Sequence, residues 1–185
     1  MMEYTFSNIV QKKMSRIGLG TWAIGGWMWG GTDEKKSIDT IVSAFDKGIN
    51  FIDTAPVYGF GTSEQIVGKA LKKINRREEI VLSTKVALEW DENEKVARNS
   101  SRERIIKEID DSLQRLGTDY IDVYFVHWPD PLVPFEETAE AMQQLMDQGK
   151  IRSIGVSNYN NNQMDEFRKV APIHFMQPPY NLFER

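Results

Sequence analysis

The chain has 185 residues, 41% of them hydrophobic and 27% charged, which is the composition of a globular domain with its own core. Its net charge of −4 argues against nucleic acid as the main partner, because phosphate binding favours a basic surface. The absence of cysteine excludes disulfides and thiolate chemistry, and two histidines leave little for a metal site, so we expect no metal. The N-terminal sequence MMEYTFSNIV lacks the features of a signal peptide, and no apolar run could span a bilayer, so we expect a cytoplasmic protein without a membrane partner.

Short apolar runs alternate with longer amphipathic segments along the chain. The runs predicted to be buried parallel strands, bounded by Gly, Asp, Asn or Pro, are 16–19, 50–52, 80–84, 121–126, 151–156 and 174–176. The segments predicted to be helices are 33–46, 63–71, 101–116, 134–147 and 160–170, with Ser63 as the N-cap of the second. No stretch is typical of a linker, so we expect a single domain over residues 1–185.

This alternation of strand and helix, at intervals of roughly 30 residues, indicates βαβ units and a parallel sheet. Two α/β architectures fit: a closed (β/α)8 TIM barrel and an open doubly wound sheet. The barrel is favoured because polar residues follow several successive strands, whereas an open sheet concentrates them at its switch point, and no GxGxxG follows the first strand. Since a barrel needs eight βα units, the chain is predicted to carry the first six of them as a partial barrel.

Four titratable residues lie where predicted strands end: Asp53, Tyr58, Lys85 and His127. Each has an ordinary explanation by itself: a turn-capping aspartate, a rim tyrosine, a lysine that reaches for water and a core histidine. On one rim of a barrel they would instead form a proton-transfer site, in which the Lys85 ammonium favours the Tyr58 phenolate and Asp53 keeps Lys85 charged. His127 would donate a hydrogen bond to a carbonyl oxygen. The set carries no reductant and therefore needs a hydride donor such as a nicotinamide.

A hydroxyl and two amides follow the last two predicted strands. Ser157 and Asn158 come after Val156, and Gln177 comes after Met176. Together they could hydrogen-bond a carboxamide, whereas turn chemistry and a helix N-cap are the ordinary explanation for the Ser-Asn pair.

The segment 18–31, GLGTWAIGGWMWGG, combines glycines with three tryptophans after the first predicted strand. Such a loop predicts an apolar wall beside a backbone that another group can approach closely. Trp22, Trp27 and Trp29, joined by Trp128 beside the histidine, could line a pocket for an apolar carbonyl compound. The alternative is a packed hydrophobic loop.

Several of these segments resemble the aldo-keto reductase family, and the resemblance covers essentially the whole chain. The matching segments are IGLGTWAIGG, NFIDTAPVYGFGTSEQIVGKAL, VLSTK, RLGTDYIDVYFVHWPD and GKIRSIGVSNY. Three others, MWGGTDEK, HWPDPLVP and QPPYNLFER, most resemble the bacterial general-stress branch, close to inositol-utilisation homologues, so a role in the stress response is expected.

The resemblance implies a (β/α)8 barrel and NADPH-dependent reduction of aldehydes and ketones to alcohols, with Tyr58 as the general acid. The residues that it makes catalytic are Asp53, Tyr58, Lys85 and His127. The residues that it places at the cofactor are Gly20, Thr21 and Trp22 beside the ribose and pyrophosphate, Ser157, Asn158 and Gln177 beside the carboxamide, and Asp53.

Family members continue well beyond residue 185, into the last two strands and the basic loop that holds the adenosine 2′-phosphate. The chain is therefore expected to be the N-terminal portion of a reductase, inactive or nearly so by itself, with the C-terminal part of the same barrel as a candidate partner. The preference for NADPH over NADH rests on the family alone.

Two other functions fit some of the same residues. Some barrels of this family are nucleotide-sensing regulatory subunits with little turnover. A Schiff-base lyase that uses Lys85 as nucleophile needs a neutral lysine, which a nearby Asp53 disfavours. The charged residues of 76–79 are predicted to be solvated surface.

Overall fold

The computed structural model describes residues 2–183 and has the strand–helix order of an α/β barrel. The strands in chain order are β1 (Tyr4–Ser7), β2 (Lys12–Ser15), β3 (Gly18–Gly20), β4 (Phe51–Asp53), β5 (Val81–Val86), β6 (Leu88–Trp90), β7 (Val96–Arg98), β8 (Val123–Val126), β9 (Ile154–Ser157) and β10 (Phe175–Gln177). The helices are η1 (Ala23–Gly25), α1 (Glu34–Asp46), α2 (Thr62–Ile74), η2 (Arg77–Glu79), α3 (Arg102–Leu116), α4 (Phe135–Asp147) and α5 (Asn161–Arg168).

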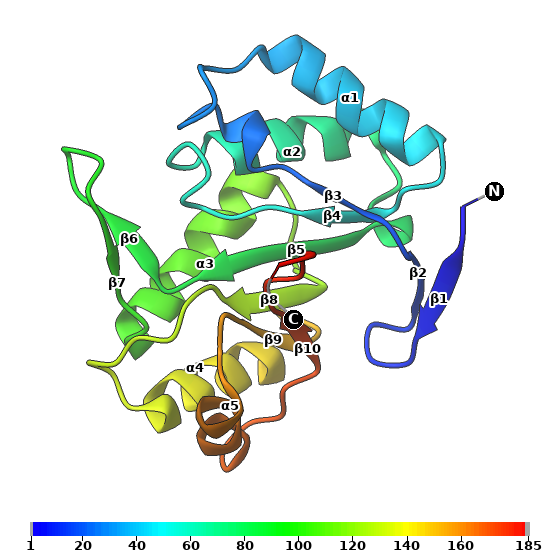
Figure 1. Cartoon of the computed structure of the whole chain (residues 1–185). Helices are drawn as coiled ribbons and strands as arrows, with labels where there is room; N and C mark the ends of the chain where they lie inside the picture. Colours follow the sequence, from blue (N-terminus) through cyan, green and yellow to red (C-terminus); the bar gives the residue numbers. More distant parts are fainter. Residues whose placement is uncertain (1, 184–185) are drawn as a thin grey trace.

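Six strands form one parallel sheet in the order β3-β4-β5-β8-β9-β10 (Figure 1). Each strand pairs with the strand that precedes it in the βα series, as in the wall of a TIM barrel. The predicted partial barrel of six βα units is thus confirmed. The strands begin one to three residues later than predicted and end up to two residues later, and an isolated bridge between Ile121 and Ile151 precedes β8 and β9.

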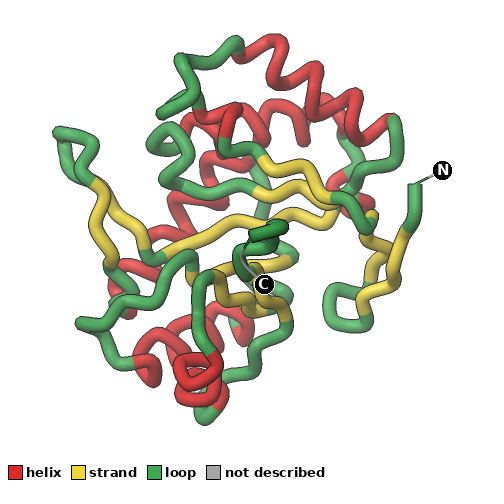
Figure 2. The backbone as a smooth tube through the Cα atoms, viewed as in Figure 1, coloured by secondary structure: helices red, strands yellow, loops and turns green. Residues whose placement is uncertain are grey.

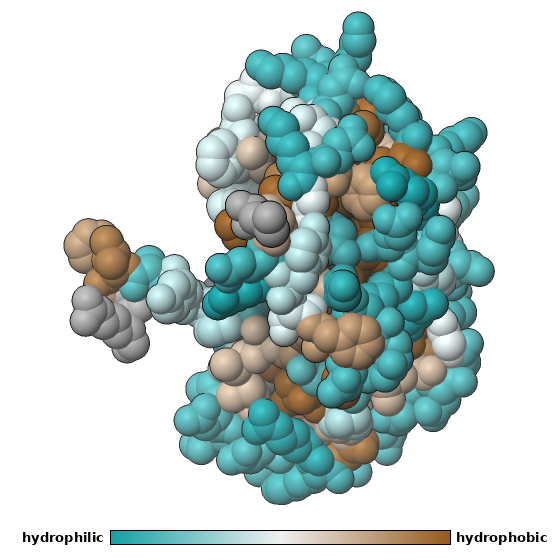
Figure 3. Space-filling model, turned by 90° about the vertical axis from the view of Figure 1, so that its right-hand side faces the viewer, coloured by the Kyte–Doolittle hydropathy of each residue, from teal (hydrophilic) through white to brown (hydrophobic). Residues whose placement is uncertain are grey.

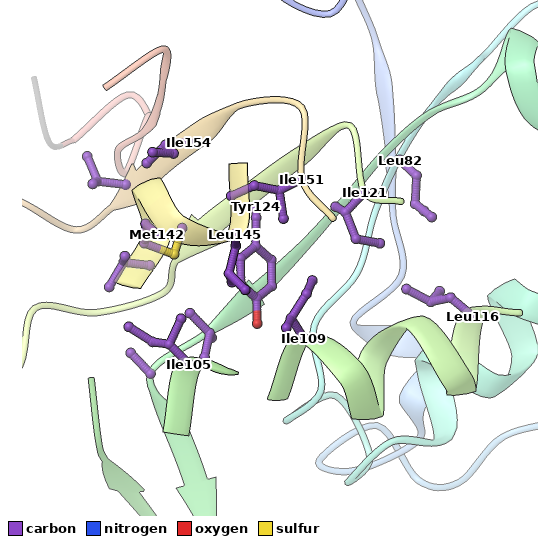
Figure 4. Packing of buried hydrophobic residues seen from close by; sticks show 14 of the residues in the cluster. Leu82, Ile105, Ile109, Leu116, Ile121, Tyr124, Met142, Leu145, Ile151 and Ile154 are labelled. Atoms are coloured by element: carbon purple, nitrogen blue, oxygen red, sulfur yellow. The ribbon is translucent and has the colours of Figure 1, made fainter. Parts of the chain in front are cut away.

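The five α-helices lie around the outside of the curved sheet, each packed against the next (Figure 2). Residues that face outward from the strands form the main core with them, and Tyr124 of β8 lies among side chains of α3 and α4 (Figure 4). The alternate residues face the other side, where Val81, Val123 and Phe125 pack with Val10 from the N-terminal hairpin. Because successive strand residues point to opposite faces, this second face also carries the polar residues of the strand ends.

Two antiparallel hairpins were not predicted from the sequence. The β1–β2 hairpin lies at the end from which the parallel strands start, and this end, which faces the viewer in Figure 3, is mostly hydrophilic with hydrophobic patches between. It is tied to the sheet by Asn50, whose side chain accepts from Ser15 N at 2.8 Å and donates to the Lys13 carbonyl at 2.8 Å. The β6–β7 hairpin projects from the opposite end, directly after β5 (Figure 1).

The start of α2 differs from the prediction. Its N-cap is Gly61, with φ of 95°, and not Ser63. A left-handed φ of this kind suits glycine, which has no Cβ to clash. Ser63 lies in the first turn with its side chain fully buried toward the strand ends, where it takes part in the site described below.

Candidate active site

The predicted catalytic residues lie on the inner face of the sheet, at the ends of neighbouring strands. Asp53 is the last residue of β4 and pairs in register with Ser83, two residues before Lys85 in β5. His127 follows β8 directly, and its amide donates to the Val86 carbonyl at 2.9 Å. The period-two alternation of strand residues therefore brings these side chains onto one face at one end.

Lys85 is the centre of this group, with only 2% of the residue exposed. Its Nζ donates to Asp53 Oδ2 at 2.7 Å and to the Thr54 carbonyl at 2.9 Å. Ser83 Oγ holds the other carboxylate oxygen of Asp53 at 2.6 Å. Burial opposes the charge on Lys85, but the Asp53 carboxylate and the Tyr58 phenol outweigh it and raise the pKa of the amine. Lys85 is therefore a charged ammonium at neutral pH.

Tyr58 lies in the turn after β4, half-buried, with the Lys85 ammonium 5.0 Å from the centre of its ring. The Trp22 ring stacks on one side at 6.2 Å, and the His127 ring meets it edge-on at 5.9 Å. A Cβ added to Gly25 would lie 2.5 Å from the Tyr58 carbonyl oxygen, so the first loop and the tyrosine turn pack backbone against backbone. Gly25 thus allows the first loop to pack directly against the backbone that carries Tyr58.

The His127 ring is neutral over the whole physiological range. Burial, together with the positive charge of Lys85, lowers its pKa to about 3. A neutral imidazole has one N–H donor and one acceptor nitrogen, so it can donate a hydrogen bond without competing with Tyr58 as a strong acid.

The predicted cofactor-amide residues form a connected group at the ends of β9 and β10. Asn158 Nδ2 donates to the His127 carbonyl at 2.8 Å and to Ser157 Oγ at 3.0 Å, and Ser157 Oγ donates to the Gln177 carbonyl at 3.0 Å. Asn158 has a left-handed φ of 62°, which asparagine tolerates better than most residues. Within residues 2–183 the Gln177 side-chain amide has no hydrogen bond, so it is available to a ligand together with Asn158 Oδ1.

Of the three residues of the first loop that are expected at the cofactor, Thr21 is buried, and Gly20 and Trp22 are exposed. Thr21 is fully buried, and both its amide and its Oγ1 donate to the Asp53 carbonyl, at 2.9 and 3.0 Å. The Cβ position of Gly20 meets no atom within 4 Å, and Trp22 is 45% exposed. The backbone of this loop at Gly20 is therefore accessible to another molecule.

The tryptophans do not form one continuous wall. Trp29 meets Trp22 edge-on at 5.6 Å, next to Tyr58, but Trp27 packs on Phe60 at 5.0 Å instead. Phe60 in turn contacts Trp90 of the β6–β7 hairpin at 5.5 Å.

Trp128 forms a third part of the rim, under the Arg98 guanidinium at 5.2 Å. Phe60, Trp90 and Arg98 were not predicted. Trp90 could have been identified from the sequence by its position, because it is an aromatic residue shortly after the strand that bears Lys85.

Two features of the described residues bear on other kinds of function. No three His, Asp or Glu side chains among residues 2–183 are grouped so that they could hold a metal ion. Over the same residues, no helix is long and apolar enough to cross a bilayer.

Comparison with known proteins gives one consistent result. The sequence profile of the aldo/keto reductase family matches residues 16–185. The chain is 63% identical over 184 residues to aldo-keto reductase YhdN of Bacillus subtilis, covering 100% of this chain and 55% of that protein. It is 42% identical over 186 residues to the NADH-specific methylglyoxal reductase of Escherichia coli, covering 93% of this chain and 57% of that protein.

Among solved structures, the glycerol dehydrogenase AKR11B4 of Gluconobacter oxydans superposes with a TM-score of 0.87 at 50% identity, covering 100% of this chain and 56% of that one. The chain thus spans little more than half the length of the proteins that it matches.

Proposed function

Because the chain belongs to the aldo/keto reductase family, we propose that the protein reduces the carbonyl group of aldehydes or ketones to an alcohol, using a nicotinamide cofactor. The observation that carries this proposal is the buried Lys85 ammonium, held by Asp53 at 2.7 Å and set beneath the Tyr58 ring. A nicotinamide cofactor, when bound, would supply the hydride for the new C–H bond at the carbonyl carbon.

Tyr58 supplies the proton in this proposal. As the hydride arrives, the carbonyl oxygen gains negative charge, takes the proton from the Tyr58 hydroxyl and becomes the alcohol. The phenolate that remains is stabilised by the Lys85 ammonium. Neutral His127 orients the carbonyl oxygen with a hydrogen bond, and Asp53 keeps Lys85 charged and in place.

The group at the ends of β9 and β10 fits the carboxamide of a nicotinamide. A carboxamide has two donor hydrogens and one acceptor oxygen, and Asn158 Oδ1 and the Gln177 amide offer complementary groups. Gly20 and Trp22, where the first loop opens, would lie beside the ribose and pyrophosphate. Trp22 and Trp29, which lie next to Tyr58, would contact the substrate, and Trp27 and Trp128 would complete the lining of the pocket.

NADPH is our proposed donor. The ground for it is the family resemblance, while one relative is by name an NADH-specific reductase. A fluorescence titration of the protein with NADPH and NADH in parallel tests the choice. Tighter binding of NADH would contradict the NADPH proposal but leave the proton-transfer site untouched.

Replacement of the phenol tests the general acid. In the full-length enzyme, in which every kinetic test is made, Tyr58→Phe should lower kcat for aldehyde reduction by about 10²–10⁴-fold, the usual contribution of a general acid, with cofactor affinity nearly unchanged. Tyr124→Phe is the matched control, since this fully buried residue lies on the outer face of the sheet and its hydroxyl has no partner within residues 2–183. Turnover of Tyr58→Phe within a few fold of the wild type would rule out this role. Very slow turnover of the full-length wild type with every aldehyde tested, despite saturating cofactor, would point to a regulatory subunit instead.

A further inference from the structure

Ser63, in the first turn of α2, lies where three segments of the site meet. It is fully buried, as are Thr21 of the first loop and Thr54 at the end of β4. Ser63 Oγ donates to Thr21, whose Oγ1 lies at 2.8 Å and whose carbonyl lies at 2.9 Å. Thr54 Oγ1 lies 3.0 Å from Ser63 Oγ, and the Ser63 amide donates to the Tyr58 carbonyl at 3.1 Å.

The donors and acceptors of this cluster indicate one direction for its hydrogen bonds. Thr21 Oγ1 uses its proton on the Asp53 carbonyl at 3.0 Å, so it accepts from Ser63. Because Ser63 has a single hydroxyl proton and gives it to Thr21, Thr54 must donate to Ser63. The result is a chain of hydroxyls from Thr54 through Ser63 and Thr21 to the Asp53 carbonyl, and such chains strengthen their members cooperatively.

Both ends of this hydroxyl chain lie on residues that hold Lys85. The Thr54 carbonyl accepts from Lys85 Nζ at 2.9 Å, and the Asp53 carboxylate accepts from it at 2.7 Å. Water does not reach the three hydroxyls, since Thr21, Thr54 and Ser63 are all fully buried. The position of the ammonium under the Tyr58 ring therefore depends on a group that touches neither the ammonium nor the phenol ring.

We infer that Ser63 is a positioning residue for the proton donor: its hydroxyl bonds Thr54 directly and Asp53 through Thr21, and these two residues hold Lys85, while its amide holds the backbone of Tyr58. This inference rests on the proposed function for its kinetic consequence. Its geometric consequence, the position of the Lys85 ammonium, does not depend on turnover.

Two substitutions test the clamp from different sides. Ser63→Ala removes the central hydroxyl, and Thr54→Val removes the Thr54 hydroxyl but keeps the residue's shape and carbonyl. Each should lower kcat about tenfold with KM changed less than about twofold, because a displacement of 1 Å in such a site costs ~10²-fold and a smaller one is expected here. The double variant should lose less than the product of the two single effects, since both break the same chain. Ser63→Thr, which restores the hydroxyl, should recover most of kcat.

Ser153→Ala is the matched control. Ser153 is also fully buried, and its Oγ donates to the Asp122 carbonyl at 2.6 Å, but at the opposite end of the sheet. This variant should lose stability like Ser63→Ala and keep its kcat. Equal kcat in Ser63→Ala, Thr54→Val and Ser153→Ala would overturn the inference, even if Tyr58→Phe is inactive and the reductase proposal stands.

Crystal structures of Ser63→Ala and Thr54→Val test the inference without a measurement of enzyme activity. The contact between Lys85 Nζ and the Thr54 carbonyl should lengthen by several tenths of an ångström from 2.9 Å in both, but not in Ser153→Ala. An unchanged contact would contradict the clamp. If Ser63→Ala does not fold, Thr54→Val alone decides the question. A lengthened contact in a protein that reduces no carbonyl would support the clamp and contradict the proposed function.

Discussion

The two ends of the parallel sheet each contain a buried carboxylate, an ammonium paired with it and a half-buried phenol beside that ammonium, but within residues 2–183 only one end has an imidazole against the phenol. At the end where the strands finish, Asp53 pairs with Lys85, and the half-buried Tyr58 and His127 rings lie next to the ammonium. At the opposite end, Asp122 is fully buried and pairs with Lys12 at 2.8 Å.

Asp122 is surrounded by more positive charge than it can neutralise. Arg77 reaches its other oxygen at 2.9 Å, and Arg152 lies 3.6 Å away. The extra cations lie over the Tyr120 ring, with Arg152 at 3.8 Å and Arg77 at 4.1 Å from its centre. Cations over an aromatic face are stabilised by its quadrupole, so this arrangement holds the start of the strands together.

The comparison teaches that a buried ion pair is not in itself a sign of catalysis. Both carboxylates accept from strand residues as well as from cations: Ser83 Oγ at Asp53 and the Leu82 amide at Asp122. The Asp122 end also has a phenol beside its ammonium, since Lys12 Nζ lies 5.3 Å from the centre of the Tyr120 ring. What distinguishes the Asp53 end within residues 2–183 is the His127 imidazole, which lies edge-on to the Tyr58 phenol at 5.9 Å, whereas the Tyr120 ring is covered by Arg77 and Arg152. The first predictions below make the same substitution at both ends of the sheet and compare the effects.

The largest effect is expected from Lys85→Met. It removes the charge that would stabilise the phenolate in the proposed mechanism and should lower kcat by about 10²–10⁴-fold. It also leaves the Asp53 carboxylate buried without its cation, which should cost about 3–5 kcal/mol of unfolding free energy. Lys12→Met makes the same chemical change at the other end and should cost stability while kcat stays within twofold of the wild type. Steady-state kinetics and urea unfolding of both variants measure this, and a large kcat loss in Lys12→Met would remove the distinction between the ends.

Next in size is the effect of Asp122→Asn. Lys12 and Arg77 would lose their carboxylate, and we expect a loss of about 3 kcal/mol, at the lower end of the range for a broken buried pair because both cations are partly exposed. Asp53→Asn should instead show its main effect in kcat. Denaturant unfolding and initial rates on the same two variants check the pair. Equal kcat losses would mean that the two ends are coupled.

Much of this arrangement could be predicted from the sequence, because strand periodicity and strand ends are local properties. Asp53, Lys85 and His127 each terminate a run of apolar residues, and parallel strands bring such ends together. The partial barrel followed from the alternation of six such runs with helices. The strand bounds were off by up to three residues because strand ends depend on pairing partners that the sequence does not show.

The parts that could not be predicted are those that depend on distant contacts. Arg77 was expected to be solvated surface, which is wrong: its side chain is 19% exposed and bonds Asp122, which is 45 residues away. Ser63 fits an N-cap by its residue type, yet its hydroxyl is used on Thr21, 42 residues earlier. Glu64 is fully buried only because Arg115 and Thr84 each lie 2.6 Å from its carboxylate oxygens. No local pattern marks such residues.

A smaller effect concerns the two histidines, which lie at different places on the sheet and should differ in how they link stability to pH. The folded pKa of His127 is lowered to about 3, below the ordinary 6.5, so between these values the unfolded chain binds a proton that the folded one does not. Stability is therefore fully present above pH ~6.5 and declines as the pH falls toward ~3. His127→Gln should reduce this decline, as measured by urea unfolding at pH 7 and pH 5. Burial also lowers the pKa of His174, but its ring is less enclosed, so His174→Gln should reduce it less. An equal pH dependence in His127→Gln and the wild type would contradict the burial of a neutral imidazole.

The smallest effect is expected where an ion pair is short but exposed. Lys69 Nζ lies 2.6 Å from Glu34 Oε2, closer than Lys12 lies to Asp122, but both side chains are 53% exposed, whereas those of Lys12 and Asp122 are 10% and 0% exposed. Water screens the exposed pair and both long side chains lose rotamer freedom, so Lys69→Met should change the unfolding free energy by less than about 1 kcal/mol. Lys12→Met, the same substitution at the buried pair, should cost several times more. Urea unfolding of the two variants at low and high salt separates the cases, since only the exposed pair is sensitive to ionic strength. Equal losses would mean that contact distance rather than burial sets the strength of ion pairs in this sheet, and the contrast drawn between its two ends would then lose its energetic basis.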